Sequence, residues 1–357
     1  MIYEIFVIIF SYFHLPIWLK APTWQLIRAG FWFALIVTFV MFAVLVLVLA
    51  ERKILAKFTV RKGPNRVGYN GFLQTVADAI KLLFKEDIIP KNANKFLFSL
   101  APVVFFLPCL VILSIIPFSS DFIALKADCG LLLLLGFGAI SMLGIVIAGC
   151  ASNNKYALIG AMRAVAQSIS YELPMLTAAI SVVVLNNSMN LTKIAQNQNN
   201  ILEWNVFPSF IGFFVFLVCS IAELNRTPFD LPEAESELVS GYNVEYSGMK
   251  FALFFLAEYA CLFVYSALIV TLFFGGFSSP FGVYLLSFLP IFKHFVFLEQ
   301  IFWLILKTSA IIFLIMWIRA TFPRLRADQL MDFCWKFLYP ISVINLIFVL
   351  IYKYYLG

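Results

Sequence analysis

The stretch ELNRTPFDLPEAESELVSGYNVEYSG, residues 223–248, is a polar island in an apolar chain. Its only base is Arg226. Six carboxylates accompany that base, at Glu223, Asp230, Glu233, Glu235, Glu237 and Glu245. Apolar runs at 206–223 and 251–274 flank the stretch, each close to the length that crosses a bilayer core. The stretch is therefore predicted to connect two membrane helices, and the rest of the chain repeats this alternation.

Composition supports a membrane protein along the whole length. Of 357 residues, 63% are hydrophobic and 12% are charged, and the mean hydropathy is +0.96. Such values are typical of polytopic membrane proteins rather than soluble multi-domain proteins. Residues 1–28 lack the features of a cleaved signal peptide. We expect them to form an apolar segment at the membrane boundary, followed by one transmembrane domain over 29–357.

Uncharged windows of membrane-spanning length predict an all-α polytopic fold with about eight transmembrane helices. The windows lie near 29–50, 96–118, 130–151, 164–185, 206–223, 251–274, 299–318 and 334–353. Between the first two, GFLQTVADAIKLLFK (71–85) places apolar and polar residues on opposite helix faces, which predicts an interfacial amphipathic helix. The acidic stretch is expected to be a structured loop.

Lysine and arginine predict the orientation. The loops after the first, third, fifth and seventh windows hold 18 of the 25 Lys and Arg residues, counting Lys336 at the start of the last window with the loop before it. By the positive-inside rule these loops face the matrix or cytoplasm, and both termini face the other side. The acidic stretch then lies inside.

Three charges fall inside the apolar windows and away from their ends, at Glu172, Glu258 and Lys307. At about 1.5 Å per residue, Glu172 and Glu258 lie at a similar depth, roughly 10–12 Å from the predicted inner ends of their helices. Ionisable groups inside a membrane are costly and mark ion or proton pathways. Lys307 is nearer mid-membrane, where we expect a carboxylate or water partner and a place in a polar chain.

The sequence contains no recognisable metal-binding or nucleotide-binding motif. The six cysteines are at least 20 residues apart, only two histidines are present, and no dinucleotide-binding glycine fingerprint or calcium loop occurs. We expect the chain to carry no nicotinamide, flavin, iron–sulfur or metal cofactor of its own.

The acidic loop has a local helix signal. Asp230 is a suitable N-cap for a short helix starting near Leu231, with Glu233 at the capping-box position and Gly241 as the end. The basic residues of 319–326 could balance the acids of 233–237.

Seven motifs occur in order between Leu47 and Lys336: AERKILA, RKGPNRVG, ADAIKLL, SNNKYALIGAMRAVAQSISYELP, the acidic stretch itself, AEYA and RATFPRLRADQLMDFCWK. Together they closely resemble NADH dehydrogenase subunit 1, the family of H-type membrane subunits of respiratory complex I. The resemblance implies a ubiquinone-access tunnel under the quinone-reducing arm and the start of a proton path.

The resemblance also implies roles for individual residues. The quinone cavity would be formed by Glu51, Arg52, Arg61, Asp78, Arg226, Phe229, Asp230, Glu233, Glu235, Arg319 and Arg324. The proton path would continue through Tyr171, Glu172, Glu223, Glu237, Glu258 and Tyr259, to which we add Lys307.

The expected function is therefore that of a membrane component of a proton-translocating NADH:ubiquinone oxidoreductase, coupling quinone reduction to proton transfer. Ubiquinone would be the substrate, with NADH, FMN and iron–sulfur clusters in partner subunits of the peripheral arm and antiporter-like subunits beside it in the membrane. Composition favours the mitochondrial inner membrane over a bacterial plasma membrane. Two alternatives are the membrane anchor of a membrane-bound hydrogenase and a free-standing cation antiporter.

Overall fold

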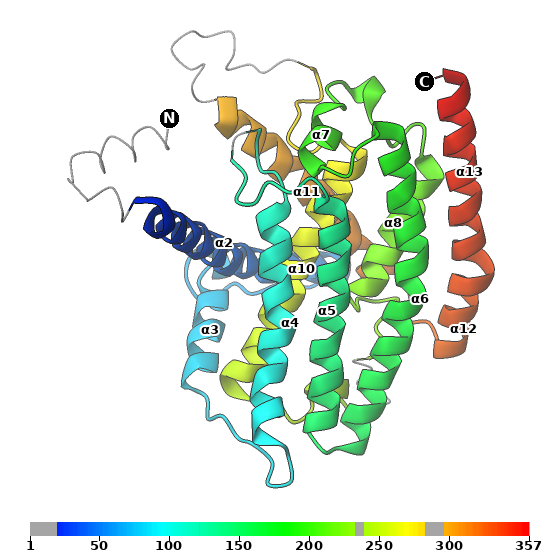
Figure 1. The fold of residues 1–357 in the computed structure, drawn as a ribbon. Helices are drawn as coiled ribbons and strands as arrows, with labels where there is room; N and C mark the ends of the chain where they lie inside the picture. The colour runs from blue at the N-terminus through cyan, green and yellow to red at the C-terminus, as the bar shows by residue number, and fades with distance from the viewer. Residues whose placement is uncertain (1–19, 121, 233–238, 283–295, 357) are drawn as a thin grey trace. The chain divides into compact units, whose positions relative to one another are not determined.

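The structure is a computed structural model that describes residues 20–120, 122–232, 239–282 and 296–356 (Figure 1). Within these ranges the regular structure is helical, apart from one isolated bridge between Asn200 and Phe281. The chain divides into two compact units, Met1–Met41 and Phe42–Gly357. The first contains the beginning of helix α2, and the second contains everything discussed below.

Seven helices are long and apolar enough to cross a membrane, among the residues that the structure describes. They are α2 (Lys20–Phe58), α4 (Lys95–Ile115), α5 (Gly130–Ala151), α6 (Lys155–Asn186), α10 (Gly248–Phe273), α11 (Val296–Thr321) and the continuous run of α12 (Ala327–Phe333) and α13 (Tyr339–Leu356). The shorter apolar helix α8 (Phe210–Glu223) is the eighth. The all-α polytopic fold is confirmed.

Several predicted boundaries were wrong because charged residues continue a helix beyond its apolar window. Helix α2 runs on to Phe58 and therefore includes Glu51 and Arg52. Helix α6 begins at Lys155, nine residues before the predicted start, because the Asn154 side chain accepts a hydrogen bond from the Tyr156 amide at 3.0 Å and caps the first turn. Hydropathy finds where a helix meets lipid, whereas capping decides where it begins.

Helix α10 lies at the centre of the second unit. In its most apolar window 72% of the residues are buried, more than in any other described span. Helices α4 and α11 pack along it, and α4, α5 and α6 run side by side (Figure 1). At the end where α10 begins, the ring of Tyr246 stacks on Phe98 at 4.1 Å and meets Phe254 edge-on at 4.9 Å. Helix α10 is therefore the central helix of the bundle and packs against several other helices.

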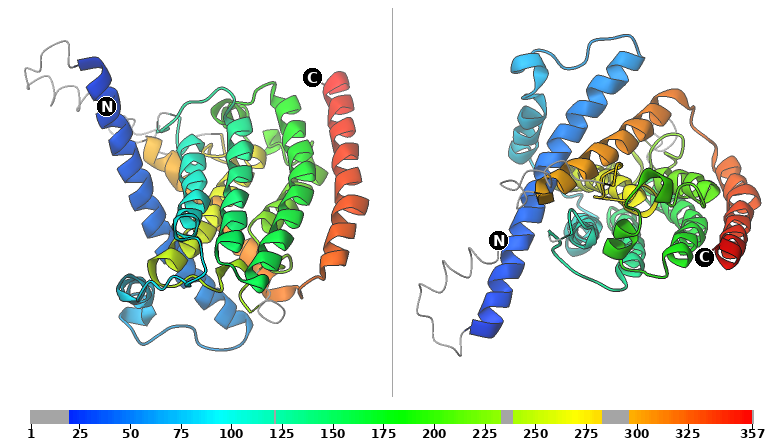
Figure 2. Two further views of the ribbon diagram at one scale, coloured as in Figure 1. Left: turned by 60° about the horizontal axis from the view of Figure 1, so that its bottom comes forward. Right: turned by 90° about the horizontal axis from the view of Figure 1, so that it is seen from above.

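A series of polar contacts, which we call the α6–α13 ladder, joins these two helices along their length. Tyr171 Oη donates to Leu330 O at 3.1 Å, and Thr177 Oγ1 lies 2.6 Å from Ser342 Oγ. Asn345 Nδ2 donates to Ser181 Oγ at 3.3 Å, and Lys353 Nζ donates to Val184 O. The contacts rise together along both sequences, so α6 and α13 are parallel neighbours (Figure 2).

The predicted amphipathic helix is α3 (Gln74–Phe84), preceded by the 3₁₀ turn Tyr69–Gly71. Its apolar residues remain exposed, including Val76, Ile80 and Leu83. On the polar side Asp78 accepts a hydrogen bond from Arg52 at 2.5 Å. Two further helical segments, α7 (Leu191–Gln196) and the 3₁₀ turn Ile201–Glu203, lie between α6 and α8.

Candidate functional site

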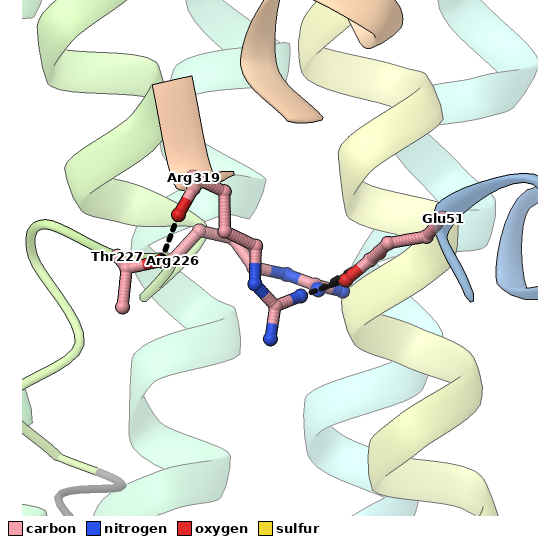
Figure 3. A network of polar contacts seen from close by, with 4 residues as sticks. All are labelled: Glu51, Arg226, Thr227 and Arg319. Carbon is pink, nitrogen blue, oxygen red and sulfur yellow. Dashed lines mark hydrogen bonds and ion pairs between the residues drawn. The ribbon is translucent and has the colours of Figure 1, made fainter. Parts of the chain in front are cut away.

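Glu51 is the centre of a buried ion cluster. Its side chain is 4% exposed and accepts hydrogen bonds from Arg226 Nη1 at 2.9 and 3.0 Å, one to each carboxylate oxygen. Arg319 Nη1 contacts the same carboxylate from the end of α11 (Figure 3). Three distant parts of the chain, α2, the segment after α8 and α11, thus meet at one carboxylate. All three residues were predicted to share a cavity, and the structure brings them together.

The segment that carries Arg226 is held at both ends. Gln167 of α6 donates through Nε2 to Ala222 O at 2.7 Å and to Phe229 O at 2.8 Å. Leu325 N donates to Pro228 O at 3.1 Å. These bonds fix the turn between α8 and the acidic stretch, so Arg226 has little freedom to leave Glu51.

The cluster contains more positive than negative charge. Two guanidinium groups share the Glu51 carboxylate, and the Arg226 guanidinium also lies 4.4 Å from the centre of the Tyr259 ring. Aromatic faces attract cations and partly compensate the cost of burying one. A buried ion pair is costly to break from one side, because the remaining charge loses both water and partner. The arrangement can therefore attract an oxygen atom that bears partial negative charge.

Glu172 and Glu223 form a second group deeper in the bundle. Glu223 ends α8, bonds to Ser168 of α6 and lies within electrostatic range of Glu172 and Tyr265. Within the described part of the chain, Glu172 Oε1 and Glu223 Oε2 are buried and have no hydrogen-bond partner. Buried carboxylate oxygens require a proton or a water molecule to satisfy them. The pair is therefore suited to holding and passing protons.

Glu258 belongs to a different neighbourhood from Glu172. The Tyr242 hydroxyl donates to Glu258 Oε1 at 3.1 Å. The prediction that Glu172 and Glu258 share a depth was counted from Ala164, whereas α6 begins at Lys155, and their depth in a membrane stays a prediction. From this true start Glu172 lies 17 residues, about 26 Å, along the helix.

Tyr246 lies beside this neighbourhood in the loop before α10. Its hydroxyl is buried and finds no hydrogen-bond partner among the described residues. Burial raises the pKa of the Tyr246 phenol above its ordinary value, so the group stays protonated. It can donate a proton to a hydrogen bond but does not supply a charge.

The remaining predicted cavity residues make separate contacts, are exposed or fall outside the described residues. Arg52 pairs with Asp78, both partly exposed, and Arg324 pairs with Asp230 at 2.9 Å. Arg61 is exposed in the turn after α2. The ring of Phe229 meets Tyr171 edge-on at 5.4 Å. The predicted helix near Leu231 and the acids Glu233, Glu235 and Glu237 fall on or next to residues 233–238, which the structure does not describe, so their balancing by the basic residues of 319–326 stays a prediction.

Lys307 binds backbone oxygens where we expected a carboxylate or water partner. Among the described residues its Nζ donates to three carbonyls, those of Phe274, Gly276 and Ser278. The expectation considered only side chains and water as partners for a buried ammonium. A helix end also offers carbonyl oxygens that its own backbone leaves free.

Two residues of the site were missed by sequence reasoning. Gln167 holds the turn that carries Arg226, and Tyr242 donates to Glu258. Gln167 left a usable signal, because an amide within a membrane-spanning window must find several hydrogen-bond partners inside the protein. Tyr242 left none, since an aromatic residue beside a helix is common in any membrane protein.

Comparison with known proteins gives a consistent result. A family model described as NADH dehydrogenase matches residues 31–350. The chain is 48% identical over 332 residues to the H-type subunit of the NADH-quinone oxidoreductase of Brevibacillus brevis, covering 93% of this chain and 94% of the relative. It is 46% identical to the corresponding protein of Geobacillus kaustophilus over 339 residues, covering 94% and 98%. The matched region contains Glu51, Glu172 and Glu223 together with both arginines of the ion cluster, and the chain belongs to the NADH dehydrogenase family of membrane subunits.

Proposed function

We propose that this chain is the membrane subunit of an NADH-quinone oxidoreductase that admits the quinone and converts its reduction into proton movement. The buried Glu51 carboxylate between Arg226 and Arg319 is the observation that carries the proposal. The names of the relatives support the enzyme complex, since both are subunits of NADH-quinone oxidoreductase.

The quinone head group would bind beside this ion cluster. A quinone carbonyl accepts hydrogen bonds, and its oxygen gains negative charge as electrons arrive. Guanidinium groups aimed at such an oxygen stabilise the developing charge. Reduction to quinol takes up two electrons and two protons, so negative charge develops near Glu51 when electrons arrive and disappears when the protons follow. Arg226 and Arg319 would then be shared between Glu51 and the reacting oxygen.

The proton path would begin at the carboxylates next to this cluster. Arg226 lies over the Tyr259 ring, and Glu258 precedes Tyr259 on α10. Glu223 is three residues before Arg226 and interacts with Glu172. A change in the charge of the ion cluster would alter the proton affinity of these acids, because electrostatic interactions are strong where water is excluded. Glu237 and the neighbouring acids would link the cavity to this path.

The partners follow from this role. Ubiquinone is the proposed substrate, and NADH, FMN and iron–sulfur clusters would be held by the peripheral-arm subunits, with no cofactor in this chain. Antiporter-like subunits would adjoin it in the membrane. The protein is a multi-pass membrane protein. Composition favours the mitochondrial inner membrane, whereas the bacterial relatives favour a plasma membrane.

The relatives also bear on the two alternatives. A hydrogenase anchor and a cation antiporter would both require a function other than that named for proteins 46–48% identical over most of the chain. We therefore retain the quinone reductase as the proposal.

The test uses Glu172→Gln and Glu223→Gln in the intact complex in sealed membrane vesicles. Each change keeps the shape but removes the titratable proton, so we expect quinone reduction and proton uptake to fall by about tenfold or more. Electron transfer from NADH to an artificial acceptor would be unchanged, because it does not use this chain. Glu203→Gln, at an exposed acid, is the matched control. Full quinone-linked turnover in both buried variants would refute the proposal.

A further inference from the structure

The end of α10 opposite Glu258 holds a buried cation among backbone carbonyls. Lys307 Nζ donates to Phe274 O at 2.7 Å, Gly276 O at 3.2 Å and Ser278 O at 2.7 Å. Lys307 is 8% exposed. An ammonium group has three N–H donors and no acceptor, so these three carbonyls use its entire hydrogen-bonding capacity. We call the three oxygens the carbonyl cage.

The backbone of the cage is built on two glycines. Gly275 and Gly276 have φ values of +73° and +51°, in the left-handed region where side chains are disfavoured. A Cβ on Gly275 would lie 2.6 Å from Gln198 O, which leaves no room for a side chain. The turn therefore directs the carbonyls of 274, 276 and 278 toward one point by a conformation that glycine permits.

Two neutral side chains satisfy the neighbouring carbonyls of α10. Gln198 Nε2 donates to Thr271 O at 3.3 Å and to Leu272 O at 3.2 Å, while Gln198 Oε1 accepts from Gly275 N at 3.1 Å. Asn205 Nδ2 also donates to Leu272 O, at 2.8 Å. These bonds hold the turn in place without using the three cage oxygens, which are left for the ammonium group.

The environment favours a fixed positive charge. The C-terminal end of a helix carries partial negative charge, and α10 ends at Phe273. The ring of Trp204 lies 5.2 Å from Lys307 Nζ and adds a cation–π contact. Backbone carbonyls neither accept nor release a proton in the physiological range. These contacts stabilise a cation, and the three hydrogen-bond acceptors of Lys307 in the described part of the chain are carbonyl oxygens, which do not take up its proton.

We propose that the turn after α10 is an ammonium-binding carbonyl cage whose resident cation is the Lys307 side chain, and that Lys307 is a positioning residue for α10 and not a proton carrier. The inference rests on the proposed function only in that α10 carries Glu258 and Tyr259. Glu258 is 15 residues before Phe273, about 22 Å along the helix. Because the cage fixes the C-terminal end of α10, it sets the axial position and the rotation of that helix, and with them the positions of Glu258 and Tyr259.

The decisive variant is Lys307→Arg in the intact complex. Arginine keeps the positive charge and N–H donors but does not release a proton in proteins. A positioning role predicts that the assembled variant keeps the wild-type ratio of protons moved to NADH oxidised. An assembled Lys307→Arg complex that reduces quinone but moves fewer protons per NADH would overturn the proposal.

A second experiment tests the cage directly with Lys307→Ala. Without the ammonium we expect quinone reduction to fall by about tenfold, since small misplacements of catalytic groups cost up to about a hundredfold. Added methylammonium, which can enter the vacated cage, would restore activity and the midpoint of thermal inactivation in a saturable way. Tetramethylammonium has the same charge but no N–H group, and we expect no restoration. Equal effects of both ions, or of neither, would contradict the cage.

Lys353→Met is the matched control, because Lys353 also donates to a backbone carbonyl near a helix end, that of Val184 on α6. We expect methylammonium to have no effect on its activity. The temperature at which this chain dissociates from the complex, followed by the subunit composition after heating, does not depend on quinone chemistry. If the quinone role is wrong, the Glu172→Gln and Glu223→Gln variants reduce quinone as fast as the wild type. The effect of methylammonium on the stability of Lys307→Ala still tests the cage in that case.

Discussion

Helix α10 is contacted by a buried cation at each of two places, and the partners of the two cations differ. Arg226 lies over Tyr259 and pairs with the Glu51 carboxylate, which also binds Arg319. Lys307 lies at the other end and binds three backbone carbonyls. The first cation faces a group that can gain or lose a charge, whereas the second faces dipoles that cannot.

The Glu51 cluster can therefore respond to a new charge, whereas the carbonyl cage only holds α10 in place. In the Glu51 cluster any new charge, such as that on a reduced quinone, competes for the two guanidinium groups. At the carbonyl cage the three N–H donors of Lys307 are all used, and its hydrogen-bond acceptors are backbone oxygens that do not titrate. We expect substitutions at the first place to change the coupling between quinone and protons, and those at the second to change stability and turnover together.

The largest effect is expected for Glu51→Gln. The change leaves the buried Arg226 guanidinium and the partly exposed Arg319 guanidinium near each other without a counter-charge, and loss of one partner from a buried ion pair costs about 3–5 kcal/mol. Quinone reduction in vesicles should be lost while electron transfer to an artificial acceptor remains in whatever complex assembles. The temperature at which this chain dissociates from the complex should also fall. Wild-type quinone turnover in a Glu51→Gln complex would contradict the idea that the Glu51 cluster, unlike the carbonyl cage, responds to the quinone.

An intermediate effect is expected for Gln198→Leu at the far end. Leucine has a similar size but cannot bond to Thr271 O, Leu272 O or Gly275 N, and a buried group left unsatisfied costs about 1–3 kcal/mol. We predict a lower midpoint of thermal inactivation with an unchanged number of protons per NADH. A reduced proton ratio at full stability would show that this end also takes part in coupling. Gln196→Leu, at an exposed glutamine of α7, provides the control.

The smallest effect is expected for Lys336→Met. Lys336 pairs with Asp332 at 2.6 Å, but both side chains are more than 60% exposed. An exposed pair at this helical spacing contributes about 0.3–0.5 kcal/mol. Thermal inactivation and quinone turnover should both match the wild type within error. A large loss at this position would imply that the exposed face of α12 is covered in the complex.

The helices were largely predictable because lipid imposes a simple requirement on length and polarity. The boundaries were less so. Glu51 was placed after the first window, yet it lies inside α2, because a charged residue can continue a helix while facing the protein interior. The start of α6 depended on the Asn154 cap, which no hydropathy window detects.

The site was predictable in its residue types but not in its pairings. Arg226 and Glu51 were both assigned to the cavity, but 175 residues separate them and no local pattern specifies that they meet. The partners of Lys307 are main-chain oxygens, which every residue has and which a sequence therefore cannot mark. The glycine pair 275–276 is a turn signal, but it does not specify which side chain the turn binds.

The α6–α13 ladder has a consequence for how the protein is made. Helix α6 leaves the ribosome about 160 residues ahead of α13, an interval of roughly 8–30 s at ordinary rates of synthesis. The hydroxyls of α6 have hydrogen-bond acceptors before α13 is made. Thr177 and Ser181 donate to carbonyls of their own helix at 2.9 and 2.6 Å. The side-chain amide of Asn345 in α13 instead donates its hydrogen bonds to Ser181 on the earlier helix and to Ser209, the residue before α8. The earlier helices thus act as a template on which the later one becomes stable in lipid.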